Sequence, residues 1–248
     1  MNSAITYLTD PDPIFEKLYL EVRKKEGRSF PEEEIRLLPE LPKGHPLHNE
    51  FQLRKRNAIR FAGYVHCKGE QLNILELGCG NGWFSNFLSK HCKPGKMAAM
   101  DVNEFELRQA AKTFQNSTIS WIYGDIFTAS ISDPPFDIIV LNASVQYFKD
   151  LDKLTVRLNE LLSPGGEMHF MDTVFYGSER ERVAAQKRTR EYYTQLGFPE
   201  MADHYFHHCI NEPGKVDVMQ QPSASKNMFS KLSGGIADPF HWIRIGKR

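Results

Sequence analysis

Residues 74–85 read Ile-Leu-Glu-Leu-Gly-Cys-Gly-Asn-Gly-Trp-Phe-Ser, and this stretch decides the fold. The mostly apolar run 72–77 predicts a buried strand, and residues 83–90 predict a helix that follows almost at once. The turn between them contains three glycines, which admit positive φ and let a ligand approach the backbone closely. The start of a helix adds unpaired N–H groups and partial positive charge. Strand, glycine turn and helix in this order predict a nucleotide-binding corner.

The spacing of the glycines distinguishes between two kinds of ligand. A dinucleotide fold requires G-x-G-x-x-G, with the pyrophosphate seated on the helix N-terminus. Here the loop reads G-x-G-x-G, and Trp83 stands where the third glycine would fall. Glu76 also places a carboxylate beside the loop, where it suits an ammonium group better than a diphosphate. The loop therefore argues against a dinucleotide.

Polar residues follow the later predicted strands at regular intervals. The run 97–100 ends in Asp101, and an acidic residue at the end of the second strand can accept both hydrogen bonds of a ribose diol. A third strand is expected at 119–123, followed by Gly124-Asp125-Ile126, and a fourth at 136–142, followed by Ala143-Ser144. A turn at 162–166 then leads into a fifth expected strand at 167–175.

In this order, the motifs resemble those of class I S-adenosylmethionine-dependent methyltransferases. The resemblance implies a doubly wound α/β fold whose seven-stranded, mostly parallel sheet has an antiparallel C-terminal edge strand. It implies S-adenosyl-L-methionine as cofactor and S-adenosyl-L-homocysteine as product. In that family, an acidic residue at the position of Asp125 meets the adenine amine. The cofactor-binding residues that the resemblance implies are Glu76, Gly78, Cys79, Gly80, Gly82, Asp101, Val102, Asp125, Ile126 and Asn142.

The composition is that of an ordinary globular protein. With 248 residues, 41% of them hydrophobic and 25% charged, the chain fits one large domain or a core with a modest lid. No apolar stretch approaches the ~20 residues that a membrane helix needs. The N-terminus lacks the pattern of a signal peptide, and the four cysteines show no C-x-x-C spacing. We therefore expect free thiols and a cytoplasmic protein without a membrane span.

Charge argues against nucleic acid as the partner. The 31 basic and 31 acidic residues balance, whereas proteins that grip nucleic acid usually carry a basic patch. The densest basic stretch, 54–56 with Arg60, is interpreted as the solvated face of a helix, with contact to RNA as the alternative. A small-molecule acceptor is therefore favoured, and the sequence does not indicate an oligomeric state.

We expect two parts in the chain. Residues 1–48 form a helical and connector segment with a helix at 13–25, which would act as a lid. Residues 49–248 form the cofactor-binding domain, beginning with an amphipathic helix at 49–67. Its later elements are a helix at 178–196 and two final strands at 216–219 and 240–245. The long connection 220–235, with a short helix at 224–232, would cover the substrate.

The residue that performs catalysis is less evident. A sulfonium already carries an activated methyl group, so the protein mainly positions the acceptor, which can contribute about 7–11 kcal/mol. A general base is optional. The candidates are Tyr147, as a pocket wall near the sulfonium or as ordinary packing, and His204 or His207, as a base for an oxygen acceptor or as part of a solvated segment. His48 and Arg54 would reach the cofactor carboxylate or the substrate, or lie on the surface.

Two motifs that suggest other chemistry are set aside. The histidine cluster 204–208 lacks the spacing of a zinc site, and magnesium prefers carboxylates, so no metal is expected. Residues 133–136 read Asp-Pro-Pro-Phe, which looks like a motif of amino-group methyltransferases, but they precede the fourth strand instead of following it. We interpret them as a turn that enters the strand.

The sequence thus predicts an enzyme that transfers a methyl group from S-adenosylmethionine to an oxygen or nitrogen atom of a small molecule. Two alternatives remain open. The first is a non-catalytic, cofactor-binding regulatory or partner protein. The second is a methyltransferase that acts on RNA or protein. Nothing in the sequence identifies the acceptor.

Overall fold

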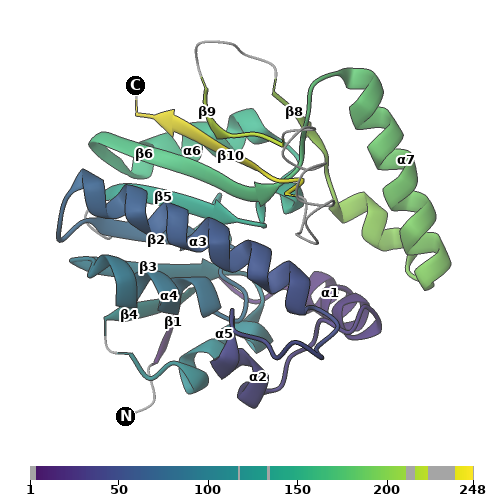
Figure 1. Ribbon diagram of the computed structural model, residues 1–248, viewed down its shortest axis with the longest axis horizontal. Coiled ribbons are helices and arrows are strands. Elements are labelled where there is room, and N and C mark those ends of the chain that lie inside the picture. Colours follow the sequence, from purple (N-terminus) through teal and green to yellow (C-terminus); the bar gives the residue numbers. More distant parts are fainter. Residues whose placement is uncertain (1–3, 117, 133–134, 211–215, 223–237, 248) are drawn as a thin grey trace.

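The computed structural model describes the chain except residues 1–3, 117, 133–134, 211–215, 223–237 and 248. Its main sheet has eight strands in the order β1-β4-β3-β2-β5-β6-β10-β9 (Figure 1). The six strands from β1 to β6 in this order are parallel, and β10 runs antiparallel to both β6 and β9. These strands are β1 (Ile5–Tyr7), β2 (Asn73–Leu77), β3 (Lys96–Asp101), β4 (Ile119–Tyr123), β5 (Phe136–Asn142), β6 (Leu162–Thr173), β9 (Asp217–Gln220) and β10 (His241–Gly246). A separate parallel pair consists of β7 (Phe175–Tyr176) and β8 (His208–Cys209).

The sheet has the expected doubly wound, mostly parallel arrangement, but with eight strands instead of seven. The additional strand is β1, which lies along the edge of β4. Beyond it, the backbone N–H of Leu8 donates to the carbonyl of Tyr123 at 2.9 Å. A three-residue strand is too short to show the period-2 pattern from which strands are predicted. The N-terminal segment therefore contributes to the sheet as well as supplying helices.

Helices cover both faces of the sheet because its strands are buried on both sides. Ile74 of β2 packs in the cluster beneath α3, α4 and α5, whereas its neighbour Leu75 packs in the cluster beneath α6. Figure 1 shows α3 in front of the sheet, α6 behind it, and α7 extending beside it. The helices are α1 (Pro13–Lys25), α2 (Glu32–Leu37), α3 (His48–Lys68), α4 (Trp83–Cys92), α5 (Glu104–Thr113), α6 (Leu151–Leu161) and α7 (Glu179–Leu196), with short 3-10 helices η1 (Val145–Tyr147) and η2 (Pro199–His204).

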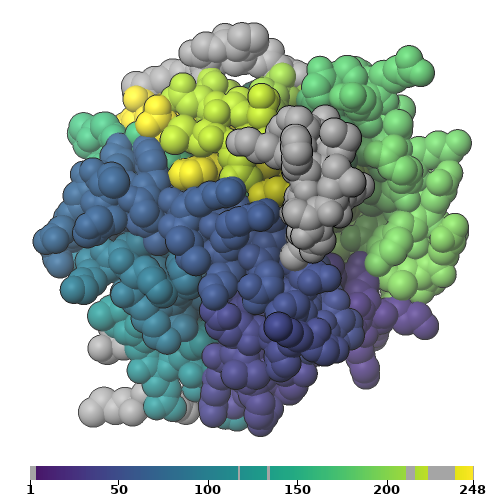
Figure 2. Space-filling view, in the orientation of Figure 1, coloured from purple at the N-terminus to yellow at the C-terminus, as the bar shows by residue number. Residues whose placement is uncertain are grey.

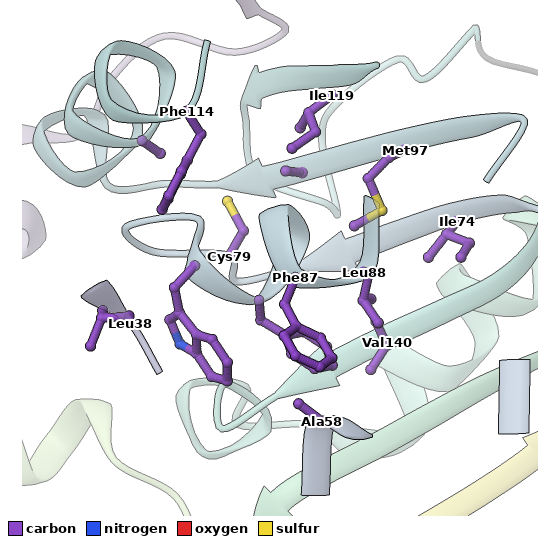
Figure 3. Packing of buried hydrophobic residues seen from close by; sticks show 14 of the residues in the cluster. Leu38, Ala58, Ile74, Cys79, Phe87, Leu88, Met97, Phe114, Ile119 and Val140 are labelled. Carbon is purple, nitrogen blue, oxygen red and sulfur yellow. The ribbon is translucent and has the colours of Figure 1, made fainter. Parts of the chain in front are cut away.

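Aromatic and aliphatic side chains fill the space between α3, α4 and the sheet. Figure 3 shows Phe87 and Leu88 of α4 next to Ala58 of α3 and Val140 of β5. Phe61 of α3 is fully buried in the same cluster. Fully burying one such side chain stabilises the fold by about 1.5–3 kcal/mol. This layer holds the glycine turn, which leads directly into α4, in a fixed position.

Most expected elements are present. The helix at 13–25 and the strands at 119–123 and 136–142 have the predicted bounds. Helix α3 is one residue longer than predicted at each end, α4 ends two residues later, and α7 begins one residue later. Strand β6 begins at Leu162, earlier than the expected 167, and its pairing with β5 shifts register between Phe136 and Ile138. The stretch that we expected to be a turn is therefore the irregular start of a strand.

Two helices that were not predicted have clear start signals in the sequence. The side chain of Asn103 accepts a hydrogen bond from the N–H of Glu106 at the start of α5. Asp150 accepts one from the N–H of Lys153 at the start of α6. Both are N-caps, and a capping pattern could have located both helices.

Some predictions fall outside the described residues. They are the short helix at 224–232, most of the covering loop 220–235, and Asp133 and Pro134 of the Asp-Pro-Pro-Phe motif. Across the described part of the chain, no helix combines the length and apolar character that crossing a membrane requires.

Candidate functional site

The glycine loop between β2 and α4 has a backbone that other residues could not easily adopt. Gly78, Gly80 and Gly82 all have positive φ, at 77°, 50° and 74°. A Cβ on Gly78 would lie 2.4 Å from the Cβ of Ser144, and one on Gly82 would lie 2.5 Å from the ring of Trp121. At these two positions, packing against the protein itself requires glycine, in addition to the backbone conformation.

Asp101 is fixed to this loop. Its Oδ2 accepts the N–H of Gly80 at 2.6 Å, and its Oδ1 accepts the N–H of Asn103 at 2.9 Å. Burial raises the pKa of the carboxyl, and these backbone donors work in the opposite direction. Because each carboxylate oxygen can accept two hydrogen bonds, both oxygens keep acceptor capacity. Asp101 is therefore held at the end of β3 before any ligand binds.

Asp125 and Ile126 lie at the end of β4. The N–H of Phe127 donates to Asp125 Oδ1 at 3.0 Å, and the N–H of Asp125 donates to Thr9 Oγ1 at 3.1 Å. The side chain of Ile126 is buried. The N-terminal segment therefore helps to hold the backbone at a position that the sequence assigned to adenine recognition.

Two adjoining cavities lie along the glycine loop. The smaller has a volume of about 320 Å³ and the larger one of about 790 Å³. Both are lined by Tyr19, Gly78, Gly80, Ala143 and Tyr147. The smaller cavity also contains Asp101, Val102, Asp125 and Ile126, and the larger contains Glu76, Cys79 and Asn142. The structure thus brings nine of the ten residues expected to bind cofactor to these two cavities, whereas Gly82 packs against Trp121 and lines neither.

Glu76 and Asn142 give the larger cavity acceptor groups for a cation. Glu76 is 2% exposed, accepts a hydrogen bond from the hydroxyl of Ser85, and has its pKa raised to about 8 by burial. Asn142 Oδ1 is buried and has no hydrogen-bond partner among the residues that the structure describes. A buried acceptor without a partner is costly, so Asn142 favours a ligand that donates hydrogen bonds, such as an ammonium. A cation there would also favour the ionised form of Glu76.

The three candidate catalytic residues lie in different places. Tyr147 lines both cavities, and burial raises the pKa of its phenol, which is therefore neutral. His204 lines the smaller cavity, with its ring 4.9 Å from that of Phe15. His207 lines the larger one and shares a hydrogen bond of 2.9 Å with the hydroxyl of Thr189. Burial lowers the pKa of His207 to about 4, so its imidazole is neutral at physiological pH.

The larger cavity also contains charged residues from distant parts of the chain. Arg54 of α3 lines it, and its Nε donates to Glu50 at 3.0 Å. His48 instead pairs with the carbonyl of Leu41 at 2.7 Å and lines neither cavity. Sequence reasoning missed the cavity residues Tyr19, Arg23, Glu106 and Asp172. The spacing of Tyr19 and Arg23 on one face of a predicted helix was an available signal.

The described residues offer no evident metal centre. Among them, no three His, Cys, Asp or Glu side chains are grouped so that they could hold an ion. His204, His207 and His208 are close in sequence, but His208 is a buried residue of β8, whereas His207 faces the larger cavity.

Comparison with solved structures identifies the class of fold. The N-methyltransferase NodS from Bradyrhizobium japonicum, in complex with S-adenosyl-L-homocysteine, aligns with a TM-score of 0.54. The alignment covers 93% of this chain and 98% of that chain at 17% sequence identity. This likeness concerns the fold, and the fold is the one shared by class I methyltransferases.

Comparison of sequences then identifies the family. Residues 74–166 match the model of a methyltransferase domain. An uncharacterised methyltransferase of Mycobacterium bovis is 33% identical over 95 residues, which are 38% of this chain and 47% of that protein. The malonyl-[acyl-carrier protein] O-methyltransferase of Priestia megaterium is 32% identical over 101 residues, which are 41% of this chain and 36% of that protein.

Residues 74–166 thus match a methyltransferase domain, and the class I methyltransferase resemblance recognised in the glycine loop is confirmed. The chain spans about half the length of the mycobacterial relative and about a third of the malonyl-carrier-protein one. The regions on either side of the core, which supply much of the larger cavity, therefore have to be interpreted from their own residues.

Proposed function

We propose that this protein binds S-adenosyl-L-methionine and transfers its methyl group to an oxygen or nitrogen atom of a small-molecule acceptor. The observation that carries the proposal is the pair of cavities that meet at the glycine loop. The smaller one, with Asp101 and Asp125, suits an adenosine. The larger one falls in the usual range of small-molecule pockets and has room for an amino-acid end and an acceptor together.

The residues present fit this cofactor. Asp101, already held by two backbone donors, would accept the hydroxyls of the ribose with its remaining lone pairs. Asn142 Oδ1 and Glu76 would accept hydrogen bonds from the ammonium group. An added positive charge would also favour the ionised form of Glu76, whose burial opposes ionisation.

The cofactor, when bound, supplies an activated methyl group on a sulfonium, so the protein mainly binds, orients and excludes water. Tyr19 and Tyr147 lie where the two cavities meet, and their aromatic rings would form the wall beside a cation. The neutral phenol of Tyr147 can donate a hydrogen bond to an acceptor atom. His207 is neutral, but a pKa near 4 makes it a weak base, so we assign it a binding role.

The names of the relatives include both acceptor atoms, oxygen and nitrogen. The matched protein from Priestia megaterium is named as an O-methyltransferase of malonyl-[acyl-carrier protein], and the structural neighbour NodS as an N-methyltransferase. The larger cavity is lined by both aromatic and charged side chains, which suits an acceptor with a polar group on an apolar body.

The first experiment is calorimetric titration with S-adenosylhomocysteine, run beside NAD. We expect micromolar binding of S-adenosylhomocysteine and none of NAD. Asp101→Asn should weaken binding about tenfold or more, because it removes the charge from two hydrogen bonds. Asp152→Asn, on the exposed face of α6, is the matched control and should bind as the wild type does. Preference for NAD, or equal binding by both variants, would overturn the proposal.

A second experiment addresses transfer. Cell extract is incubated with the protein and cofactor labelled in the methyl group, and then separated into small molecules, RNA and protein. We expect label among the small molecules. Label in RNA or protein would instead support a macromolecular acceptor. Tight binding without any transfer would support a regulatory protein that only binds the cofactor.

A further inference from the structure

Arg23 differs from Arg28 and Arg54, two other arginines that line the larger cavity. Arg28 donates to both oxygens of Glu50, at 2.9 and 2.6 Å, and Arg54 donates to the same carboxylate. Arg23 makes one long contact, from Nη1 to Glu26 at 3.4 Å. Its Nε is buried and has no hydrogen-bond partner among the described residues. A guanidinium with five donors thus lines a cavity while most of its hydrogen-bonding capacity is unused.

The acidic groups near Arg23 balance its charge only in part. Glu26 also accepts the hydroxyl of Tyr192 at 2.9 Å and lies 3.9 Å from Arg28, so one carboxylate serves three donors. Glu106 is the other nearby carboxyl, and burial raises its pKa to about 7, so it is roughly half protonated at neutral pH. The side chain of Arg23 keeps 27% of its surface exposed, and it lines the larger cavity.

A chain of four tyrosine rings begins at this guanidinium. Its central carbon lies 5.4 Å from the ring centre of Tyr19. Tyr19 contacts Tyr147 edge to face at 5.7 Å, and Tyr147 contacts Tyr205 at 5.9 Å. Tyr193 packs against Tyr205 at 6.1 Å, and all four rings line the larger cavity. Burial raises the pKa of each phenol, so all four hydroxyls remain neutral and able to donate hydrogen bonds.

These residues come from both ends of the chain. Tyr19 and Arg23 belong to α1, whereas Tyr193 belongs to α7 and Tyr205 follows η2. Figure 2 shows the purple N-terminal residues lying against the green residues of the C-terminal half. Arg23, Tyr193 and Tyr205 line the larger cavity but not the smaller one that contains Asp101 and Asp125. Tyr19 and Tyr147 line both cavities, so the cluster extends from the edge of the predicted adenosine site into the larger cavity.

We infer that Arg23 and the four tyrosines form an anion-binding subsite for the methyl acceptor. The acceptor is then a small molecule with an apolar or aromatic body and a carboxylate or phosphate group. Arg23 binds the anion, neutral phenols donate to it, and the rings cover the body. This inference rests on the proposed methyl transfer, since it names the class of molecule that the larger cavity receives.

The test is calorimetric titration of three probes that share a phenyl group: phenylacetate, phenyl phosphate and the neutral phenylacetamide. Each is added to the protein alone and to the protein saturated with S-adenosylhomocysteine. We expect one or both anions to bind about tenfold or more tightly than the amide. The two anions distinguish a carboxylate-bearing acceptor from a phosphate-bearing one. Equal binding of all three probes, or no binding of either anion, would overturn the inference.

Variants locate the site. Arg23→Gln should abolish the preference for the anion, whereas Arg108→Gln, at an exposed arginine of α5, should retain it. Glu26→Gln should strengthen anion binding, because it removes the carboxylate that competes for Arg23. If Arg23 only stabilises the fold through Glu26, Glu26→Gln would lower the melting temperature without raising the affinity for the anion. The inference would then be wrong.

The cofactor's own carboxylate is the competing anion. Titration with S-adenosylhomocysteine and with 5′-methylthioadenosine, which lacks the amino-acid end, separates the two roles. We expect Arg23→Gln to leave both affinities within about twofold of wild type. Selective loss of S-adenosylhomocysteine binding would assign Arg23 to the cofactor and overturn the inference. Absence of S-adenosylhomocysteine binding in the wild type would instead contradict the proposed function, while the probes still report on Arg23.

Discussion

Individual carboxyl groups at this site differ in what surrounds them, although all lie at the ends of strands or beside the same loop. Asp101 is held by the N–H groups of Gly80 and Asn103. Asp172, with a positive φ of 50°, accepts the amide of Asn57 at 2.7 Å, and burial raises its pKa to about 6. Glu76 has the hydroxyl of Ser85 as its partner and a pKa near 8. Glu76 has fewer hydrogen-bond donors than Asp101 to offset the effect of burial on its pKa. Its carboxyl is therefore mainly protonated without ligand.

This difference gives a prediction for stability against pH. The pKa of Glu76 is about 8 in the folded protein, compared with 4.5 when unperturbed. Between these values the native state holds a proton that the unfolded state has released, so stability falls as pH rises through the window. Glu76→Gln should remove about 2–4 kcal/mol of that decline, because one pKa unit corresponds to about 1.36 kcal/mol. Urea unfolding at pH 5, 6.5 and 8 measures the slope.

Asp101, Asp172 and Glu106 also have raised pKa values, so the wild-type slope contains contributions from these groups as well. The informative quantity is therefore the difference between Glu76→Gln and wild type at each pH. If the free energy of unfolding changes with pH in the same way for both proteins, Glu76 is ionised in the folded state, contrary to what its burial indicates.

At the level of elements, the turn between β2 and α4 depends on what packs against it. Gly165 has nearly the same positive φ as Gly82, at 77° compared with 74°. A Cβ on Gly165 would meet nothing within 4 Å, whereas one on Gly82 would lie 2.5 Å from Trp121 and 2.8 Å from Ala110. The pair therefore separates the cost of a strained backbone from the cost of a clash.

We expect Gly165→Ala to lower the free energy of unfolding by about 1 kcal/mol, the usual cost of a left-handed residue with a Cβ. Gly82→Ala should lower it by about 2–4 kcal/mol, because it adds overpacking in the core. Chemical denaturation of both variants measures the two costs. Equal losses would mean that Trp121 can move aside, and the loop would then be less tightly packed than the structure indicates.

Elements were predictable where their signals are local. The strand, glycine turn and helix around residue 80 follow from contiguous residues, as does the acidic residue after each of the next two strands. The tyrosine cluster was not predictable, because Tyr19 and Tyr205 both pack against Tyr147 and come together only where α1 packs against η2, far away in the sequence. The roles of the cofactor-binding residues stay predictions, although nine of the ten line the two cavities.

For the whole molecule, the N-terminal segment is joined to the cofactor-binding half more closely than a separate lid would be. Tyr7 stacks on Tyr123 at 5.5 Å, and its hydroxyl donates to Glu104 at 2.6 Å. Thr9 accepts the N–H of Asp125, and Phe15 lies in the smaller cavity. The chain thus passes from the edge of the sheet directly over the expected adenosine site.

Deleting residues 1–8 should therefore weaken S-adenosylhomocysteine binding about tenfold and destabilise the protein by about 2–3 kcal/mol. The deletion exposes the edge of β4 and frees the segment that positions Thr9 and α1. Tyr7→Phe is the matched control, because it keeps the strand, loses only the two exposed hydrogen bonds of the hydroxyl, and should cost less than about 1 kcal/mol. Calorimetric affinity and turnover are measured on both proteins. If the segment helps to hold Asp125, the deletion must weaken cofactor binding. Lower turnover with unchanged affinity would contradict this expectation, and residues 1–48 would then act as a lid distinct from residues 49–248.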